Sequence, residues 1–208
     1  MAYLQLQGRS YTSMEINTFT SESQENCNKI NRDGYFWEGQ LYALQTTWFI
    51  ALGRLFDRRG YSVHRFLVLT VAQKGLFTKA ALGKRKRTAA QEDNPEWLDQ
   101  YLKTAWEPTT QDLQNIAASI GTAEARWRRA YKPIRNKVFA HQDLSVSVGE
   151  LFGQTRVADI ENILHDLNRI QIAIYQLLEN GQQQWIADDG RTYIDRFITD
   201  TRNALSRL

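Results

Sequence analysis

The spacing of apolar residues most strongly constrains how this chain can fold. Large apolar side chains recur at intervals of three and four residues through most of the sequence, and no convincing alternation typical of a half-buried β-strand is present. Only three prolines interrupt the 208 residues, so long helices are compatible with the sequence. The pattern therefore predicts an all-α protein.

Individual helices are expected from this periodicity and from the residues at its interruptions. Ser62 and Asn94 are suited to cap helix starts, since their side-chain oxygens can accept from free backbone N–H groups. Gly60 and Gly181 are suited to end helices in the left-handed conformation. The expected helices are 35–59, 63–75, 95–106, 109–120, 122–141, 157–180 and 190–208.

Between these helices, residues 83–94 are polar and charged and are expected to form a solvated connection, and residues 142–154 are expected to form a loop. A chain of this length can form one domain that buries roughly 70% of its unfolded surface. We expect an N-terminal extension over residues 1–30 and a single helical domain over residues 31–208.

Composition limits the classes of protein to which the chain can belong. Cys27 is its single cysteine, which excludes an intramolecular disulfide, indicates a reducing compartment and predicts a small, partly buried side chain. The first thirty residues lack a secretion signal, and no apolar run approaches the roughly 20 residues that cross a bilayer. A soluble, cytoplasmic protein with no membrane partner is expected.

The densest positive charge lies in residues 126–137, RWRRAYKPIRNK, which we call the basic segment. It contains no acidic residue, and Trp127 and Tyr131 are interleaved with its cations. Cations contact phosphates and aromatic faces stack on unpaired bases, so this mixture favours RNA, although a solvated helix face would explain the charges equally well. Pro133 is expected to kink the helix or to mark its start. The residues predicted to bind RNA are Arg128, Arg129, Tyr131, Lys132 and Lys137.

The basic segment continues into RNKVFAH, residues 135–141, where polar residues accompany an apolar set. In α-helical geometry Arg135 and His141 lie about 120° apart around the axis and about 9 Å apart along it. They do not share a face, so a catalytic pair within one copy would be loosely arranged. Two copies related by a two-fold axis could bring two arginines and two histidines into one cleft, which favours a homodimer.

The arrangement of Arg135, Asn136 and His141 resembles the signature of the HEPN superfamily, in which an arginine is followed by a polar residue and then by a histidine. The AHQD ending, the upstream segment ALGRLFDRRGYSVHRFL and the all-α pattern most resemble the abortive-infection branch of HEPN proteins. The similarity covers residues 35–180. It implies an all-α, HEPN-like helical bundle, to which the final helix is an addition.

The resemblance also implies metal-independent cleavage of RNA in a cleft between two protomers, in phage defence or as a toxin, with no cofactor. His141 would transfer a proton, Arg135 would hold the scissile phosphate and Asn136 would orient the motif. One alternative is a HEPN protein that binds RNA or a partner without cutting, for example beside a nucleotidyltransferase antitoxin. Another is a structural bundle in which the motif is a coincidence. The RNA substrate cannot be named from the sequence.

Other candidate sites are weaker. His64 and His165 lie within apolar helices without a Cys, His or paired carboxylate at ligand spacing, so both are expected to be packed or surface histidines. The run KRKR, residues 84–87, is expected to be solvated. The chain has no glycine-rich loop of the kind that binds phosphates.

Overall fold

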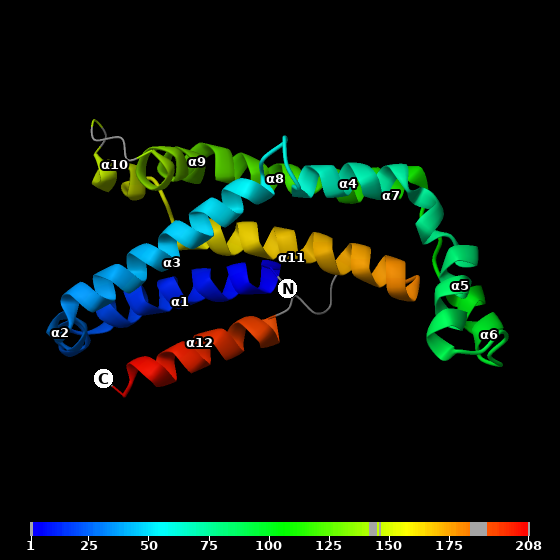
Figure 1. The fold of residues 1–208 in the computed structure, drawn as a ribbon, viewed down its shortest axis with the longest axis horizontal. Coiled ribbons are helices and arrows are strands. Elements are labelled where there is room, and N and C mark those ends of the chain that lie inside the picture. Colours follow the sequence, from blue (N-terminus) through cyan, green and yellow to red (C-terminus); the bar gives the residue numbers. More distant parts are fainter. Residues whose placement is uncertain (1, 142–144, 146, 184–190, 208) are drawn as a thin grey trace. The chain divides into compact units, whose positions relative to one another are not determined.

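All regular elements in the described part of the chain are helices, which confirms the all-α prediction (Figure 1). The computed structural model describes residues 2–141, 145, 147–183 and 191–207. The chain divides into two compact units. Unit 1 comprises residues 1–56, 126–161 and 190–208, and unit 2 comprises residues 57–125 and 162–189.

Unit 1 is built around the long helix α3. Helix α1 packs against both α3 and α12, and the π-helical segment η3 packs against α3 as well (Figure 1). The C-terminal helix expected from the sequence is present as α12. The elements are α1 (Ala2–Glu22), α2 (Gln24–Arg32), α3 (Gly34–Leu55), η2 (Trp127–Tyr131), α9 (Lys132–Ile134), η3 (Arg135–Ala140), α10 (Val148–Gly153) and α12 (Arg191–Leu205).

The N-terminal segment shares a core with the rest of unit 1. Ile16, Ile30 and Leu205 are buried together, and partly buried apolar side chains of α3, including Trp37 and Leu41, pack against them. Ser23 caps α2 by accepting from the backbone N–H of Asn26. The expected boundary between an extension and a single domain stays a prediction, because packing does not show which segments fold independently.

Unit 2 contains shorter helices, and α4 packs against α7 within it. Ser62 caps α4 as predicted, since its side chain accepts from the backbone N–H of Arg65. Thr109 caps α7 in a reciprocal arrangement with Asp112. The elements are α4 (Val63–Ala72), the 3₁₀-helix η1 (Lys74–Phe77), α5 (Lys79–Ala90), α6 (Leu98–Thr104) and α7 (Thr110–Ala118). Helices α8 (Ile120–Arg126) and α11 (Val157–Asn180) contribute residues to both units.

Gly181 ends α11 as predicted. It has φ of 57°, and its N–H donates to the carbonyl of Leu177. The prediction for Gly60 was wrong, because α3 ends earlier, at Leu55, and Phe56 follows with an ordinary negative φ of −94°. Cys27 is partly buried, as expected.

The connection expected over residues 83–94 is instead largely helix α5. Lysine, arginine and alanine are good helix formers, so high charge alone does not predict a loop. Arg85 also has a structural role, since its guanidinium donates to the carbonyl oxygens of Leu76 at 2.8 Å and Leu178 at 2.6 Å. The second of these carbonyls belongs to the last turn of α11, where a cation is favourable.

Two further boundaries differ from the predictions. Helix α6 begins at Leu98, after a turn in which the N–H of Leu98 donates to the carbonyl of Pro95. The loop expected over 142–154 contains the short helix α10, capped by Ser147. Residues 142–144 and 146 of that loop lie outside the described residues. Among the helices that the structure describes, none combines the length and apolar character needed to span a bilayer.

Candidate functional site

The basic segment and the RNKVFAH motif lie on one helical stretch that contains two π-helical parts. The first, η2, directly precedes the short α9 that contains Pro133, and the second, η3, spans Arg135 to Ala140. Proline lacks an N–H, and its ring crowds the carbonyl four residues earlier, which the wider π turn accommodates. The values of 120° and 9 Å calculated for an α-helix therefore do not describe this segment. π-Helical turns often occur at functional sites.

An aromatic cluster anchors η3 to α3. Phe139 of η3 stacks on Phe49 of α3 with ring centroids 4.8 Å apart. Tyr42 of α3 lies 5.8 Å from the same ring, and Phe152 of α10 meets it edge-on at 6.3 Å. Since such pairs add to the free energy of burial, they hold the motif at a defined place along α3.

Arg135 lies half-buried against α3. A Cβ on Gly53 would stand 2.9 Å from its Nε, so only the missing side chain of residue 53 lets the arginine take this position. Nη1 donates to Oδ1 of Asn136 at 2.8 Å. Nε is buried and has no hydrogen-bond partner among the described residues. The guanidinium is thus held at one nitrogen while another has an unused donor.

His141 ends η3 and is exposed, with φ of −128° and ψ of −5°. An exposed imidazole at the end of a helix can contact a ligand or a second protein copy without any change in the core. Asn136 is half-buried and accepts from Arg135. The structure therefore gives Asn136 a specific contact within the motif, which the sequence described only as orientation through its amide.

The cations of the basic segment and its aromatic rings have different environments. The side chains of Arg128, Arg129, Lys132 and Lys137 are exposed, which is compatible with phosphate contacts. Trp127 and Tyr131 are only 3% and 1% exposed. A ring with so little exposed surface cannot stack on a base, so the structure corrects that part of the expectation.

Tyr131 is instead a core residue of unit 1. Its hydroxyl donates to the carbonyl of Arg156 at 2.7 Å, and its ring stacks with Trp127 at 6.5 Å. Burial raises the pKa of Tyr131 to about 12, and the hydrogen bond to Arg156 only partly offsets that effect. The residue holds the start of α11 to the basic segment.

His64 and His165 do not form a metal site in the described structure. His64 is mostly buried in unit 2, with Nε2 lying 3.2 Å from Oε2 of Glu124, but the two atoms do not meet hydrogen-bond geometry. Arg58 donates to the other oxygen of the same carboxylate at 3.3 Å. His165 is half-buried on α11. Among the described residues, no three side chains of His, Cys, Asp or Glu are grouped to hold a metal ion.

Gly53 contributes to this site although it lies about eighty residues before the motif. It lies in ALGRLF, inside a helix interior, where glycine costs about 1 kcal/mol relative to alanine. An isolated glycine within a helical pattern often indicates that another part of the chain closely approaches the helix. Gly53 is such a glycine. The contacting residue, Arg135, could not be identified without the tertiary structure.

One family model matches most of the chain. Residues 11–203 match the HEPN family described as AbiU2. The chain matches no curated protein and no solved structure. The match covers nearly the whole chain and contains the RNKVFAH motif and Gly53. It also includes part of the N-terminal segment, which the resemblance did not explain. The resemblance noted from the sequence is therefore confirmed, and the chain belongs to the AbiU2 family of HEPN proteins.

Proposed function

We propose that this protein is a HEPN endoribonuclease that cuts RNA without a metal ion and acts in abortive-infection defence. The observation that carries the proposal is the position of Arg135, whose Nη1 donates to Asn136 and whose buried Nε packs against Gly53, so that two contacts fix the orientation of the guanidinium. A guanidinium presents several donors in a plane, which suits it to bind a phosphate at two points.

The proposed reaction is an attack of the ribose 2′-hydroxyl on the adjacent phosphorus. One imidazole of His141 accepts the 2′-hydroxyl proton, the bond from phosphorus to the 5′-oxygen breaks, and a protonated imidazole gives a proton to that oxygen. Arg135 stabilises the charge on the five-coordinate phosphorus. The products are a 2′,3′-cyclic phosphate and a free 5′-hydroxyl.

This chemistry needs a proton acceptor and a proton donor, and each chain supplies one motif histidine. We therefore propose a homodimer in which the two copies of His141 and of Arg135 share one cleft. The exposure of His141 supports the proposal, since it is accessible to a second copy. A stable dimer of this kind should bury well over about 1,000 Å² in total, with an apolar centre.

Membership of the AbiU2 family supports the defence role. A ribonuclease with this role needs control in the uninfected cell, so a toxin–antitoxin pairing is part of the proposal, with a cytoplasmic location. The alternative is a module that binds RNA or a partner, such as a nucleotidyltransferase antitoxin, without cutting.

The deciding experiment incubates purified protein with single-stranded RNA in EDTA and identifies the product ends. We expect cyclic phosphate ends, loss of cutting in His141→Ala, and severe loss in Arg135→Lys, which keeps the charge but not the planar fork. General acid–base catalysis contributes about 10²- to 10⁴-fold, so the His141→Ala effect would be measurable. His165→Ala is the matched control and should retain activity.

Circular dichroism and light scattering on the same samples separate the outcomes. Absence of cutting by the wild type across a broad RNA panel, with binding unchanged in His141→Ala, would support the binding-module alternative. A wild type that stays monomeric at micromolar concentration would contradict the shared cleft. Unfolding of His141→Ala would assign the histidine a structural role.

A further inference from the structure

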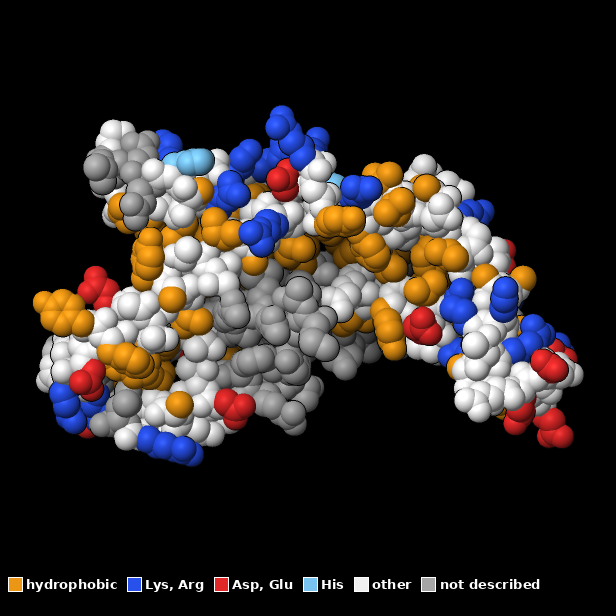
Figure 2. Space-filling view, viewed as in Figure 1, with side chains coloured by type: hydrophobic (Ala, Val, Ile, Leu, Met, Phe, Trp, Pro, Cys, Tyr) orange, Lys and Arg blue, Asp and Glu red, His pale blue; other side chains and the backbone are white. Residues whose placement is uncertain are grey.

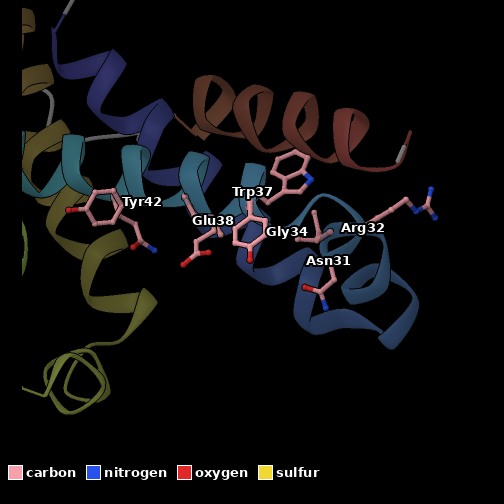
Figure 3. Close-up of a pocket in the computed structure, with 10 residues that line it drawn as sticks. Asn31, Arg32, Gly34, Trp37, Glu38 and Tyr42 are labelled. Carbon is pink, nitrogen blue, oxygen red and sulfur yellow. The ribbon is translucent and has the colours of Figure 1, made fainter.

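We propose that a groove along the start of α3 binds one unpaired nucleobase of the RNA, and that it prefers a base with an exocyclic amino group. The groove has a volume of about 760 Å³, within the range of small-ligand sites. Its lining includes Asn31, Arg32, Tyr35, Glu38, Tyr42 and Gln45 (Figure 3). The inference rests on the proposed function, since it assigns a subsite for the RNA that the motif would cut.

Aromatic rings are exposed at this groove. Tyr35 is 95% exposed and Tyr42 is 48% exposed, whereas the rings of the basic segment are buried. Base–aromatic stacking is a main source of affinity for single-stranded RNA and needs an accessible ring face. The stacking surface expected at Trp127 and Tyr131 is thus available on α3 instead.

The polar side chains of the lining suit the edge of a base. An ionised carboxylate such as Glu38 only accepts hydrogen bonds, so its ligand must offer donors. The exocyclic amino groups of adenine, cytosine and guanine each offer two N–H donors, whereas uracil has no amino group and offers only its ring N3–H. The amides of Asn31 and Gln45 can both donate and accept, as the edges of bases require. In Figure 3, Asn31 and Glu38 lie on the same side of α3, while Trp37 points to the opposite side.

Charge distinguishes the groove from the basic segment. Arg32 and Glu38 have opposite charges, so the lining has no excess of cations to bind a phosphate backbone. Figure 2 shows acidic and basic side chains beside hydrophobic ones where α2 and α3 meet. The exposed cations Arg129, Lys132 and Lys137 lie on the basic segment of the same unit. This distribution fits bases in the groove and phosphates on the basic segment.

The groove is connected to the motif through Tyr42. Tyr42 lines the groove and also contacts Phe139, which lies two residues before His141. An RNA strand held by the motif therefore has the groove within reach of a neighbouring nucleotide. Since Tyr42 also anchors η3, Tyr35 is the cleaner position at which to test the groove.

The test measures fluorescence anisotropy of the full-length protein with labelled 2′-O-methyl oligo(A) and oligo(U). These probes cannot be cut because the 2′-hydroxyl is blocked. We expect tighter binding of oligo(A) by the wild type, a loss of about tenfold for oligo(A) in Tyr35→Ala, and loss of the preference over oligo(U) in Glu38→Gln. The matched control is Tyr61→Ala, since Tyr61 is 94% exposed and lies in unit 2, and it should bind like the wild type.

Unchanged affinity and unchanged base preference in both Tyr35→Ala and Glu38→Gln would overturn the inference and leave the ribonuclease proposal intact. A change of molar mass in Tyr35→Ala, measured by light scattering, would overturn it in favour of a protein–protein contact. Groove-dependent binding by a wild type that cuts no unmodified RNA would instead support the groove and refute the proposed cleavage.

Discussion

The guanidinium of Arg135 is seated on Gly53 of α3, with Nε 2.9 Å from the place that a Cβ on residue 53 would occupy. Two segments separated by about eighty residues thus meet where one lacks a side chain and the other carries the motif arginine.

Gly53→Ala should displace Arg135 and lower RNA cleavage at least tenfold while the helices persist. A distance below 3 Å forces the arginine to shift, whereas alanine favours the helix itself by about 1 kcal/mol. Gly39→Ala is the matched control, because it places the same methyl group in the same helix with nothing within 4 Å. Equal activity of the two variants would show that the seating of Arg135 does not matter for cleavage.

Asn136→Ala should lower the rate of cleavage because the Nη1 hydrogen bond of Arg135, 2.8 Å long, is lost and the guanidinium becomes free to rotate. Asn136→Asp keeps an acceptor at the same place and should restore part of the rate. Steady-state kinetics would separate this positioning role from simple binding, since we expect the loss mainly in kcat. A loss confined to KM, or no rescue by aspartate, would argue against it.

Lys132→Ala should weaken RNA binding and reduce the dependence of affinity on salt. Each phosphate contact with a single strand contributes about −0.7 to the slope of log affinity against log salt concentration. Lys84→Ala provides the control, since Lys84 is also exposed but lies on α5 outside the basic segment. Binding titrations at several salt concentrations test the difference, and identical slopes for both variants would identify the basic segment as a solvated face.

Tyr131 should make the free energy of unfolding fall as pH rises above about 10. Its pKa is about 12 in the folded chain and near 10 when unfolded, so the unfolded state loses the phenolic proton first. The stabilisation is complete below pH 10 and is lost as pH rises towards 12. Across this pH window the free energies of unfolding of the wild type and of Tyr131→Phe, measured by denaturant titration, should converge, because the variant lacks the phenolic hydroxyl. A constant difference between them would contradict the assignment.

Ile16→Ala should destabilise the protein by about 2–5 kcal/mol, since Ile16 is buried with Ile30 and Leu205. Ile16→Val should cost about 0.5–1.5 kcal/mol at the same site. Denaturant unfolding followed by tryptophan fluorescence would measure both. A normal midpoint in Ile16→Ala would favour residues 1–30 as an extension that does not contribute to the cooperative unit.

Local features of this protein were predictable from its sequence. The periodicity of apolar residues predicted the all-α class and the bounds of α11, and Ser62 and Gly181 acted at the predicted helix ends. These features depend on the backbone and on residues within one or two turns, so nearby sequence contains the necessary information. The HEPN resemblance was accessible for the same reason, because its motif is seven residues long, RNKVFAH.

Tertiary contacts determined which side chains of the motif and its neighbours are buried and which residues they contact. The rings of Trp127 and Tyr131 are in the core because residues distant in sequence, such as Phe56 and Arg156, surround them. Gly53 received its role from Arg135 in the same way. Burial and close contacts depend on which segments pack together, and no local sequence pattern specifies the packing partner. Which side chains of the basic segment are exposed could therefore be identified only in the folded chain.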